Sequence, residues 1–212
     1  MTAEGLIGDS VSEETIDSLL AVVEGIHAAA LRTGAHSENV AAYAAAIGSE
    51  LGLDPGRLRR LRCTAILHDI GKAVVPAEIL AKPGPLTPAE RVLIERHSAA
   101  GAEMLRRAGL EHEAAMVRAH HERYDGAGYP DCLAGEAIPL EARIVFVADS
   151  FESMTSDRPY RAGMAVAAAM NELRRYAGTQ FDPMVVGVFE RVIADGRVAV
   201  RALRDAGLCA AA

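Results

Sequence analysis

Apolar residues recur at intervals of three and four along most of the chain, which is the period of a helix with one buried face. The first such stretch aligns Ile16, Leu19 and Val23. No stretch alternates apolar and polar positions for the length of a useful strand, so the pattern predicts an all-α helical bundle. The predicted helices cover residues 13–33, 37–51, 54–71, 87–107, 111–123, 140–155, 162–177 and 182–194.

Three of these helices begin with a capping residue followed by proline: Asp54-Pro55, Thr87-Pro88 and Asp182-Pro183. The side-chain oxygen of an N-cap accepts a hydrogen bond from the first turn, and proline has no N–H that would be left unpaired there. Glu90 stands three residues after Thr87 and completes a capping box. These helix starts are therefore expected at defined residues.

Residues 125–139 interrupt the helical pattern with the sequence DGAGYPDCLAGEAIP. Glycine and proline punctuate this segment, and both are turn residues. We expect a shaped loop here, with at most a short hairpin within 124–140.

The composition indicates one globular domain. The chain has 212 residues, 50% of them hydrophobic, and 22 Lys plus Arg against 29 Asp plus Glu give a net charge of −7. An acidic balance argues against polymeric nucleic acid or an anionic membrane as a partner, because both are bound by clustered Lys and Arg. We divide the single domain, 1–212, into an N-terminal helix (13–33), a core of about 30–190 and a C-terminal tail (195–212).

The sequence lacks the patterns of a secreted or membrane-spanning protein, and this indicates its cellular compartment. The first residues, MTAEGLIGDS, contain no signal-peptide pattern, and apolar runs such as 144–148 are far too short to span a membrane. Cys63, Cys132 and Cys209 are odd in number and scattered, which fits a reducing environment. We expect a cytoplasmic protein with no membrane partner.

Five of the seven histidines and two aspartates lie on apolar faces. They are His36, His68, Asp69, His97, His120, His121 and Asp149. A lone histidine on such a face is more often a hydrogen-bonded core residue, and a lone aspartate more often a cap or an ion-pair partner. A buried carboxylate nevertheless needs a partner, a proton or a metal. One metal site formed by several helices explains all seven positions together.

The types of ligand restrict which metal ions can bind at this site. Imidazole and carboxylate without thiolate suit Fe, Mn, Zn or Ni. Seven ligands exceed what one such ion takes while keeping a position for substrate. Two divalent ions that share one carboxylate are the economical interpretation, and such a pair supports in-line displacement at phosphorus.

Two motifs make the chain resemble a known family. Residues 68–72 read HDIGK and residues 120–130 read HHERYDGAGYP. The chain is similar to the HD-GYP family of metal-dependent phosphodiesterases that hydrolyse cyclic di-GMP, and the similarity continues through KPGPLTPAE at 82–90, residues 142–161 and FDP at 181–183. It extends over about 30–190 and implies the HD-domain helical bundle.

The resemblance implies a role for each candidate ligand. One ion would be held by His36, His68, Asp69 and Asp149. The other would be held by Asp69, His97, His120 and His121. Asp69 would bridge the ions, a hydroxide between them would attack phosphorus, and Lys72 would neutralise charge on the phosphoryl oxygens. Fe or Mn is favoured, with Ni and Zn as alternatives.

Substrate contacts are implied for Lys72, Tyr129, Arg158 and Arg161. Tyr129 would lie against the ligand, and the two arginines would face phosphate or guanine. Each has a simpler alternative: Lys72 at a helix C-terminus, Tyr129 packing its own loop, and the arginines paired with Glu152 or Asp157. Glu122 and Asp125 would orient ligand imidazoles or cap the loop, and we favour the former.

Three positions depart from the family pattern. Arg32 replaces a Glu that helps to hold a third ion in some members, which argues for two ions here. Asn39 replaces a common Arg, with an effect that the sequence leaves open. Glu152 replaces an Asp and is longer by one methylene.

The predicted function is hydrolysis of cyclic di-GMP to pGpG and onward to GMP. The alternatives are an HD phosphohydrolase for another cyclic dinucleotide or nucleotide, and a non-catalytic module that senses the nucleotide or docks a protein. A diguanylate cyclase bound through the GYP loop and a homodimer through the helix at 13–33 are the protein partners that we consider.

Overall fold

The computed structural model describes residues 13–29, 35–157 and 162–198. Within these ranges the chain is helical and forms no strand, apart from one isolated bridge between Ala177 and Phe181. The α-helices are α1 Glu13–Ala29, α2 Ala35–Glu50, α3 Pro55–Leu67, α4 Ala77–Leu80, α5 Pro88–Arg107, α6 Glu111–Ala119, α7 Leu140–Thr155, α8 Val166–Arg175 and α9 Pro183–Ala194. Two 3₁₀ helices are η2 Ile70–Val74 and η3 Gly135–Ala137. The all-α prediction is confirmed.

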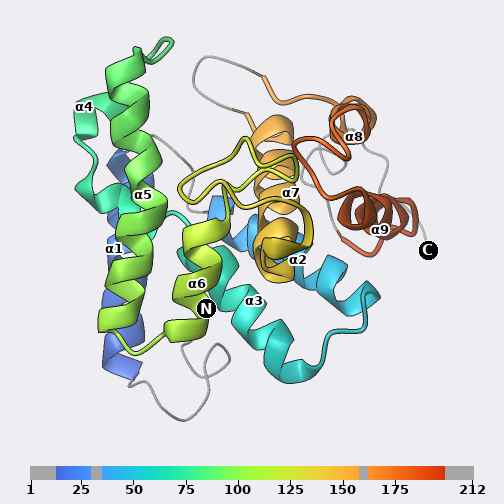
Figure 1. Ribbon diagram of the computed structural model, residues 1–212, viewed down its shortest axis with the longest axis horizontal. Helices are drawn as coiled ribbons and strands as arrows, with labels where there is room; N and C mark the ends of the chain where they lie inside the picture. Colours follow the sequence, from blue (N-terminus) through green and yellow to red (C-terminus); the bar gives the residue numbers. More distant parts are fainter. Residues whose placement is uncertain (1–12, 30–34, 158–161, 199–212) are drawn as a thin grey trace.

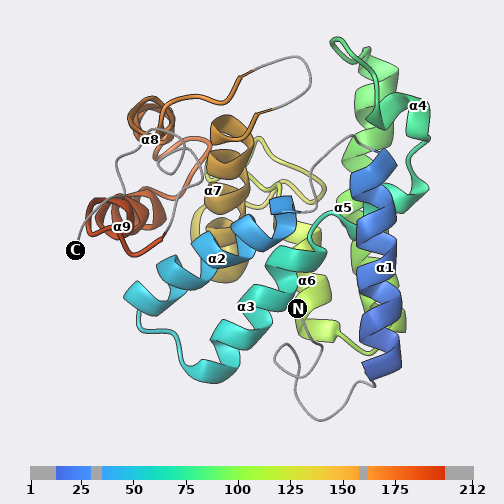
Figure 2. The same cartoon turned by 180° about the vertical axis from the view of Figure 1, so that it is seen from behind.

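Helix α7 runs through the middle of the bundle (Figure 1). Its apolar run, residues 144–148, is buried throughout because α2, α3, α6, α8 and α9 all pack against it. Helices α1 and α5 lie on one flank and α8 and α9 on the opposite flank, as both views show (Figures 1 and 2). The described helices therefore share one main core around α7.

The predicted caps are present. Asp54 accepts a hydrogen bond from the Arg57 amide at 3.0 Å, and Asp182 accepts one from the Met184 amide at 2.7 Å. Thr87 and Glu90 form the complete capping box at the start of α5. The helix starts that carried a capping signal were thus predicted correctly.

Several helix ends differ from the prediction. The third helix ends at Leu67 and not near Gly71, α6 ends at Ala119 and not near 123, and α8 spans Val166–Arg175 and not 162–177. The short helices α4 and η2 were not expected. The segment 124–140 contains turns and η3 but no hairpin.

Gly71 lies where η2 contacts α5. A Cβ at this position would lie 1.9 Å from the carbonyl oxygen of His97 and 2.4 Å from the amide nitrogen of Gly101. The backbone of η2 therefore lies directly on the backbone of α5, which only glycine allows. This close approach brings the HDIGK segment beside the helix that carries His97.

Helix α1 buries its apolar face on its own chain. Ile16, Leu19, Val23 and Ile26 are buried, and α1 packs against η2 and α3. The helix that we considered for a homodimer thus packs on the core of its own chain. Among the described residues, no helix combines the length and apolarity needed to cross a membrane.

Candidate metal centre

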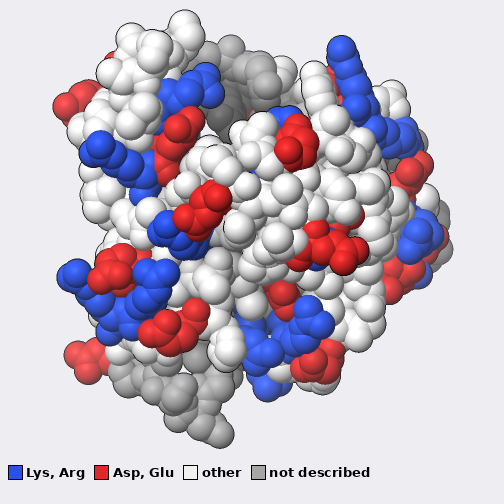
Figure 3. Space-filling view, viewed as in Figure 1, with Lys and Arg blue, Asp and Glu red and all other residues white. Residues whose placement is uncertain are grey.

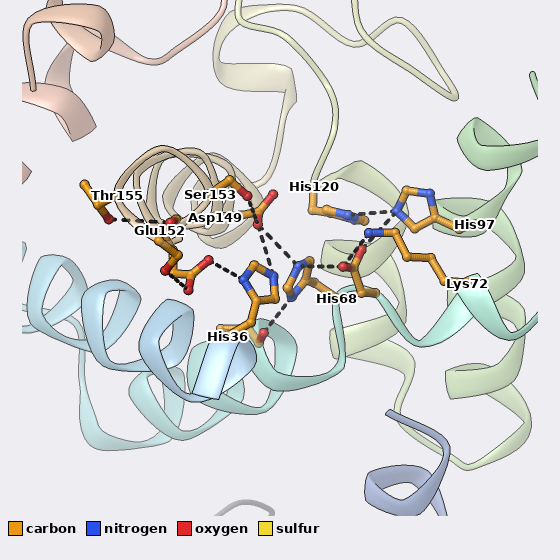
Figure 4. Close-up of polar contacts among 12 residues, drawn as sticks. His36, His68, Lys72, His97, His120, Asp149, Glu152, Ser153 and Thr155 are labelled. Atoms are coloured by element: carbon orange, nitrogen blue, oxygen red, sulfur yellow. Dashed lines mark hydrogen bonds and ion pairs between the residues drawn. The ribbon is translucent and has the colours of Figure 1, made fainter. Parts of the chain in front are cut away.

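Side chains from five helical segments converge on one buried site (Figure 4). His36 comes from the first turn of α2, His68 and Asp69 follow the end of α3, and His97 lies within α5. His120 and His121 follow the end of α6, and Asp149 lies on α7. All seven predicted ligands lie at this site.

The ligand atoms fall into two groups that share Asp69. One group is His36, His68 and Asp69, and the other is Asp69, His97, His120 and His121, with all ligand atoms of a group within 4.8 Å of one another. Asp149 Oδ1 lies 3.3 Å from His36 Nε2 and 3.8 Å from His68 Nε2, which places it beside the first group. This grouping is the same as the one that the resemblance implies.

Three of the histidines have the same local hydrogen bond. Nδ1 of His68, His97 and His120 lies 2.7, 2.6 and 2.6 Å from the carbonyl oxygen three residues earlier in the chain. A carbonyl oxygen only accepts, so each Nδ1 carries the proton and donates it. Each Nε2 is therefore the nitrogen with the free lone pair, which is the form that binds a metal ion.

Two of these lone pairs face each other. His97 Nε2 and His120 Nε2 are 3.2 Å apart, in a fully buried position. Two nitrogens with metal bonds of roughly 2.1 Å, about 100° apart at one ion, have this separation. His68 Nε2 is also buried and makes no hydrogen bond with any residue of the described ranges. The donor set fits a bound cation better than it fits a hydrogen-bonded core.

Burial keeps these imidazoles neutral. It lowers the pKa of His97 to about 4 and that of His120 to about 3, and it also holds the pKa of His68 below its ordinary value. The pKa of His121 is lowered well below the usual range for the same reason, with the neighbouring imidazole of His120 adding to the effect. At neutral pH all four rings can therefore act as ligands without first losing a proton.

Lys72 lies with its ammonium group inside the centre. Its Nζ is 2.5 Å from Asp69 Oδ2, and the side chain is only 14% exposed. The alternative of a lysine that merely sits at a helix C-terminus does not describe this contact. Lys72 places a fixed positive charge next to the carboxylate that both groups share (Figure 4).

Glu152 is a buried partner of His36 that the sequence interpretation missed. Its Oε2 contacts His36 Nδ1 directly, and its Oε1 accepts a hydrogen bond from Ser156 Oγ at 2.6 Å. Burial alone would raise the pKa of Glu152, but the hydrogen bonds from His36 and Ser156 lower it below the ordinary value. The position of Glu152, three residues after Asp149, was the available signal, because it puts both carboxylates on one face of α7.

The loop that follows α6 brings Tyr129 over the second group. The Tyr129 ring centroid lies 5.0 Å from that of His121 and 6.4 Å from that of His97. Burial raises the pKa of Tyr129 above its ordinary value, so the phenol stays protonated. A Cβ at Gly128 would lie 2.2 Å from the Arg123 amide nitrogen, so the chain folds tightly back on itself just before Tyr129.

Glu122 and Asp125 hold this loop instead of orienting imidazoles. The buried Glu122 carboxylate accepts hydrogen bonds from the amides of Asp131 and Leu133, at 2.6 and 3.1 Å. Asp125 pairs with Arg123 and accepts from the Ala127 amide. Both residues come so soon after α6 that their carboxylates meet the returning loop, which corrects the role that we favoured from the sequence.

Some predicted residues lie outside the described ranges. These are Arg158 and Arg161, expected to contact substrate, and Arg32, which replaces the family's Glu. Glu152, which we named as an alternative partner for these arginines, contacts His36.

The model of the HD domain family matches residues 23–185. The cyclic di-GMP phosphodiesterase response regulator RpfG of Xanthomonas campestris pv. campestris is 43% identical over 164 residues, which cover 75% of this chain and 43% of that protein. The 3'3'-cGAMP-specific phosphodiesterase 1 of Vibrio cholerae serotype O1 is 38% identical over 163 residues, which cover 76% of this chain and 38% of that protein. The chain thus spans about two fifths of the length of these relatives.

Solved structures share the fold. The cyclic GMP-AMP-specific phosphodiesterase V-cGAP3 of V. cholerae superimposes with a TM-score of 0.63 at 23% identity, covering 86% of this chain and 48% of the other. The HD domain of the L. monocytogenes phosphodiesterase PgpH, solved with cyclic-di-AMP, gives a TM-score of 0.57 at 17% identity, covering 85% and 97%. The family match over most of the chain and the HDIGK and HHERYDGAGYP motifs show that this chain belongs to the HD-domain family, in its HD-GYP branch.

Proposed function

We propose that this chain is a metal-dependent phosphodiesterase that opens cyclic di-GMP to pGpG and then cleaves pGpG to GMP. The observation that carries the proposal is the pair of unprotonated Nε2 atoms of His97 and His120, 3.2 Å apart beside a carboxylate shared with a second ligand group. A binuclear centre at this place suits attack on a phosphodiester. Two relatives named as phosphodiesterases of cyclic dinucleotides, 43% and 38% identical to this chain over the aligned residues, support the same class of substrate.

Two divalent ions are the implied cofactor. His36, His68, Asp69 and Asp149 would hold one ion, and Asp69, His97, His120 and His121 would hold the other. Bound there, the ions would activate water for attack at phosphorus. Fe or Mn suits an imidazole and carboxylate set without thiolate, with Ni and Zn as the other candidates.

Lys72 and Tyr129 would act on the substrate itself. The Lys72 ammonium is already directed to the shared carboxylate, from where it can neutralise charge that builds up on the phosphoryl oxygens. Tyr129 presents a neutral aromatic ring beside His121 and can stack against a guanine base. Asp69 supplies the shared ligand and Lys72 the fixed charge, and we assign the catalytic roles to these two residues.

Hydrolysis of cyclic di-GMP by protein loaded with Mn²⁺ or Fe²⁺ tests the proposal. The expected result is conversion to pGpG with slower appearance of GMP, followed by chromatography. His68→Ala and Asp69→Ala should abolish it, while His112→Ala, an exposed histidine on α6, should not. The proposal would be refuted if cyclic di-GMP stayed intact both with the Mn²⁺-loaded protein and with the Fe²⁺-loaded protein.

A second substrate has a specific observation in its favour. Relatives from Vibrio cholerae at 33–38% identity are described as specific for 3'3'-cGAMP, which differs from cyclic di-GMP in one base. A direct competition between the two nucleotides gives the ratio of kcat/KM. A ratio that favours 3'3'-cGAMP would make that nucleotide the preferred substrate, while the reaction would remain hydrolysis of a cyclic dinucleotide. Binding of cyclic di-GMP to metal-free protein without turnover in any loaded form would instead identify a sensing module.

A further inference from the structure

His36 is held differently from the other histidines of the centre. His68, His97 and His120 each donate Nδ1–H to a carbonyl three residues back in the chain. His36 lies in the first turn of α2. Its Nδ1 contacts the Glu152 carboxylate, which comes from α7, 116 positions later in the sequence.

The two ligand groups also differ in charge. Asp69 and Asp149 face the nitrogens of His36 and His68, and Glu152 stands directly behind His36. The other group consists of three imidazoles and the shared Asp69. Within residues 35–157 and 162–198, three carboxylates therefore lie at the His36 half, and Asp69 is the carboxylate in the ligand group of the His121 half. Because imidazoles are neutral ligands, this difference acts directly on the attraction for a divalent cation.

Glu152 is well placed to have an effect. Its side chain and that of His36 are each only 4% exposed, so water screens their interaction little. Ser156 Oγ donates to the second carboxylate oxygen at 2.6 Å and fixes the orientation of the group. A carboxylate bonded to the distal nitrogen of a ligand histidine fixes the ring and makes its other nitrogen a stronger donor.

We propose that Glu152 is a positioning residue that orients His36 and makes the His36 half of the centre the half that binds its metal ion first and more tightly. The residue acts through His36 and not on the substrate. This inference deepens the proposed function, since it concerns the same centre. Its test measures metal binding and not turnover, so it can fail while the phosphodiesterase activity stands.

The experiment is a titration of metal-free protein with Mn²⁺, in which free Mn²⁺ is counted by its paramagnetic resonance signal and the heat is recorded in parallel. Wild-type protein should bind two ions in two resolved steps. Glu152→Gln keeps a hydrogen-bond acceptor but removes the charge, and should raise the Kd of the first step about 10-fold. Glu152→Ala removes both and should raise it about 100-fold. The second step should change much less.

Two further variants identify which half fills first and exclude a general effect on the fold. His121→Ala should keep the tight step and lose the weak one. Glu141 lies on α7 like Glu152, roughly 16 Å from it along the helix axis, and its buried carboxylate accepts a hydrogen bond from Arg57 of α3. Glu141→Gln should therefore leave both binding steps unchanged. Nitrogen-15 spectra of the histidine rings should show His36 alone changing its Nδ1 environment in Glu152→Gln.

Three results would overturn the inference. One is an unchanged first step in Glu152→Gln. Another is an effect confined to the second step. The third is loss of the tight step in His121→Ala. If Glu152→Ala fails to fold, the near-isosteric Glu152→Gln and His121→Ala still decide the question.

Discussion

Lys72 Nζ and Asp69 Oδ2 lie 2.5 Å apart, in a 3₁₀ turn that directs the ammonium group into the centre and away from solvent. The contact joins a fixed cation to the one carboxylate that both ligand groups share. We expect Lys72→Met to lower kcat about 100-fold, because a donor to charge that develops in the transition state is lost. Metal stoichiometry, measured by elemental analysis, should stay at two ions.

The control for this prediction is Lys82→Met. Lys82 pairs with Glu90 at 2.6 Å at the start of α5 and has no role in the proposed site. A loss of activity in Lys82→Met equal to that in Lys72→Met would show that the effect of Lys72 is not local.

Gly71→Ala should destabilise the protein strongly. The new Cβ would meet the carbonyl oxygen of His97 at 1.9 Å, and since both partners are backbone, η2 and α5 must separate. We expect a loss of at least about 3 kcal/mol in the free energy of unfolding, at the upper end for overpacking. Gly187→Ala in α9 adds a methyl group where no atom lies within 4 Å, and should stabilise by up to about 1 kcal/mol. Urea unfolding measures the free energy of unfolding of both variants. A Gly71→Ala protein as stable as wild type would contradict the close packing of η2 on α5.

Stability of the metal-free protein should fall as the pH is lowered below about 6.5. The pKa values of His97 and His120 are lowered by burial to about 4 and about 3, whereas an unfolded histidine titrates near 6.5. Between these values the unfolded chain binds protons that the folded chain does not. The free energy of unfolding therefore rises with pH, by about 1.4 kcal/mol per pH unit for each such histidine, and levels off above about 6.5.

Urea unfolding at pH 7, 6 and 5 after chelation measures this slope. His97→Gln should reduce it by one histidine's share, and His112→Gln, which removes an exposed histidine, should leave it unchanged. Equal slopes in His97→Gln and in wild type would show that His97 is not buried in its neutral form.

The ion pair between Arg118 and Asp131 should influence substrate affinity more than stability. Arg118 Nε and Nη2 donate to the two carboxylate oxygens of Asp131 at 2.6 and 2.7 Å, two residues after Tyr129. The pair is partly exposed, so Arg118→Ala should cost less than about 1 kcal/mol of stability. Releasing the loop should raise KM several-fold with little change in kcat, because Tyr129 is less firmly held.

Arg174→Ala is the matched control for Arg118→Ala, since Arg174 forms a comparable exposed pair with Glu190 between α8 and α9. Asp131→Ala should reproduce the rise in KM, and the double variant should add little further. Additive effects would mean that the two residues act separately on the loop.

How far the sequence predicts this molecule depends on the range of the interaction. Caps such as Asp54 and Thr87 act within three residues, and the helices they begin were predicted correctly. The segment after α3 contacts the backbone of α5 at Gly71, and no local pattern records this contact. The unexpected helices α4 and η2 lie in this same connection.

The site shows the same division. Apolar periodicity places His97 and Asp149 toward the core, which is why the candidate ligands could be named together. Glu152 was noticed only as a departure from a motif, because its partner His36 is 116 residues away. Glu122 follows two histidines that face the centre, yet its carboxylate binds amides of a loop whose path the sequence does not reveal.

The hydrogen bonds to the carbonyl three residues back have a consequence for how the centre responds to loosening of the bundle. The rings of His68, His97 and His120 are oriented by hydrogen bonds inside their own helical turns. Their Nε2 atoms therefore stay in position to bind an ion again after chelation, without refolding. His36, in contrast, is contacted by Glu152 across the interface between α2 and α7. Separation of these two helices would therefore break the contact between Glu152 and His36 while the bonds within the turns of His68, His97 and His120 remain.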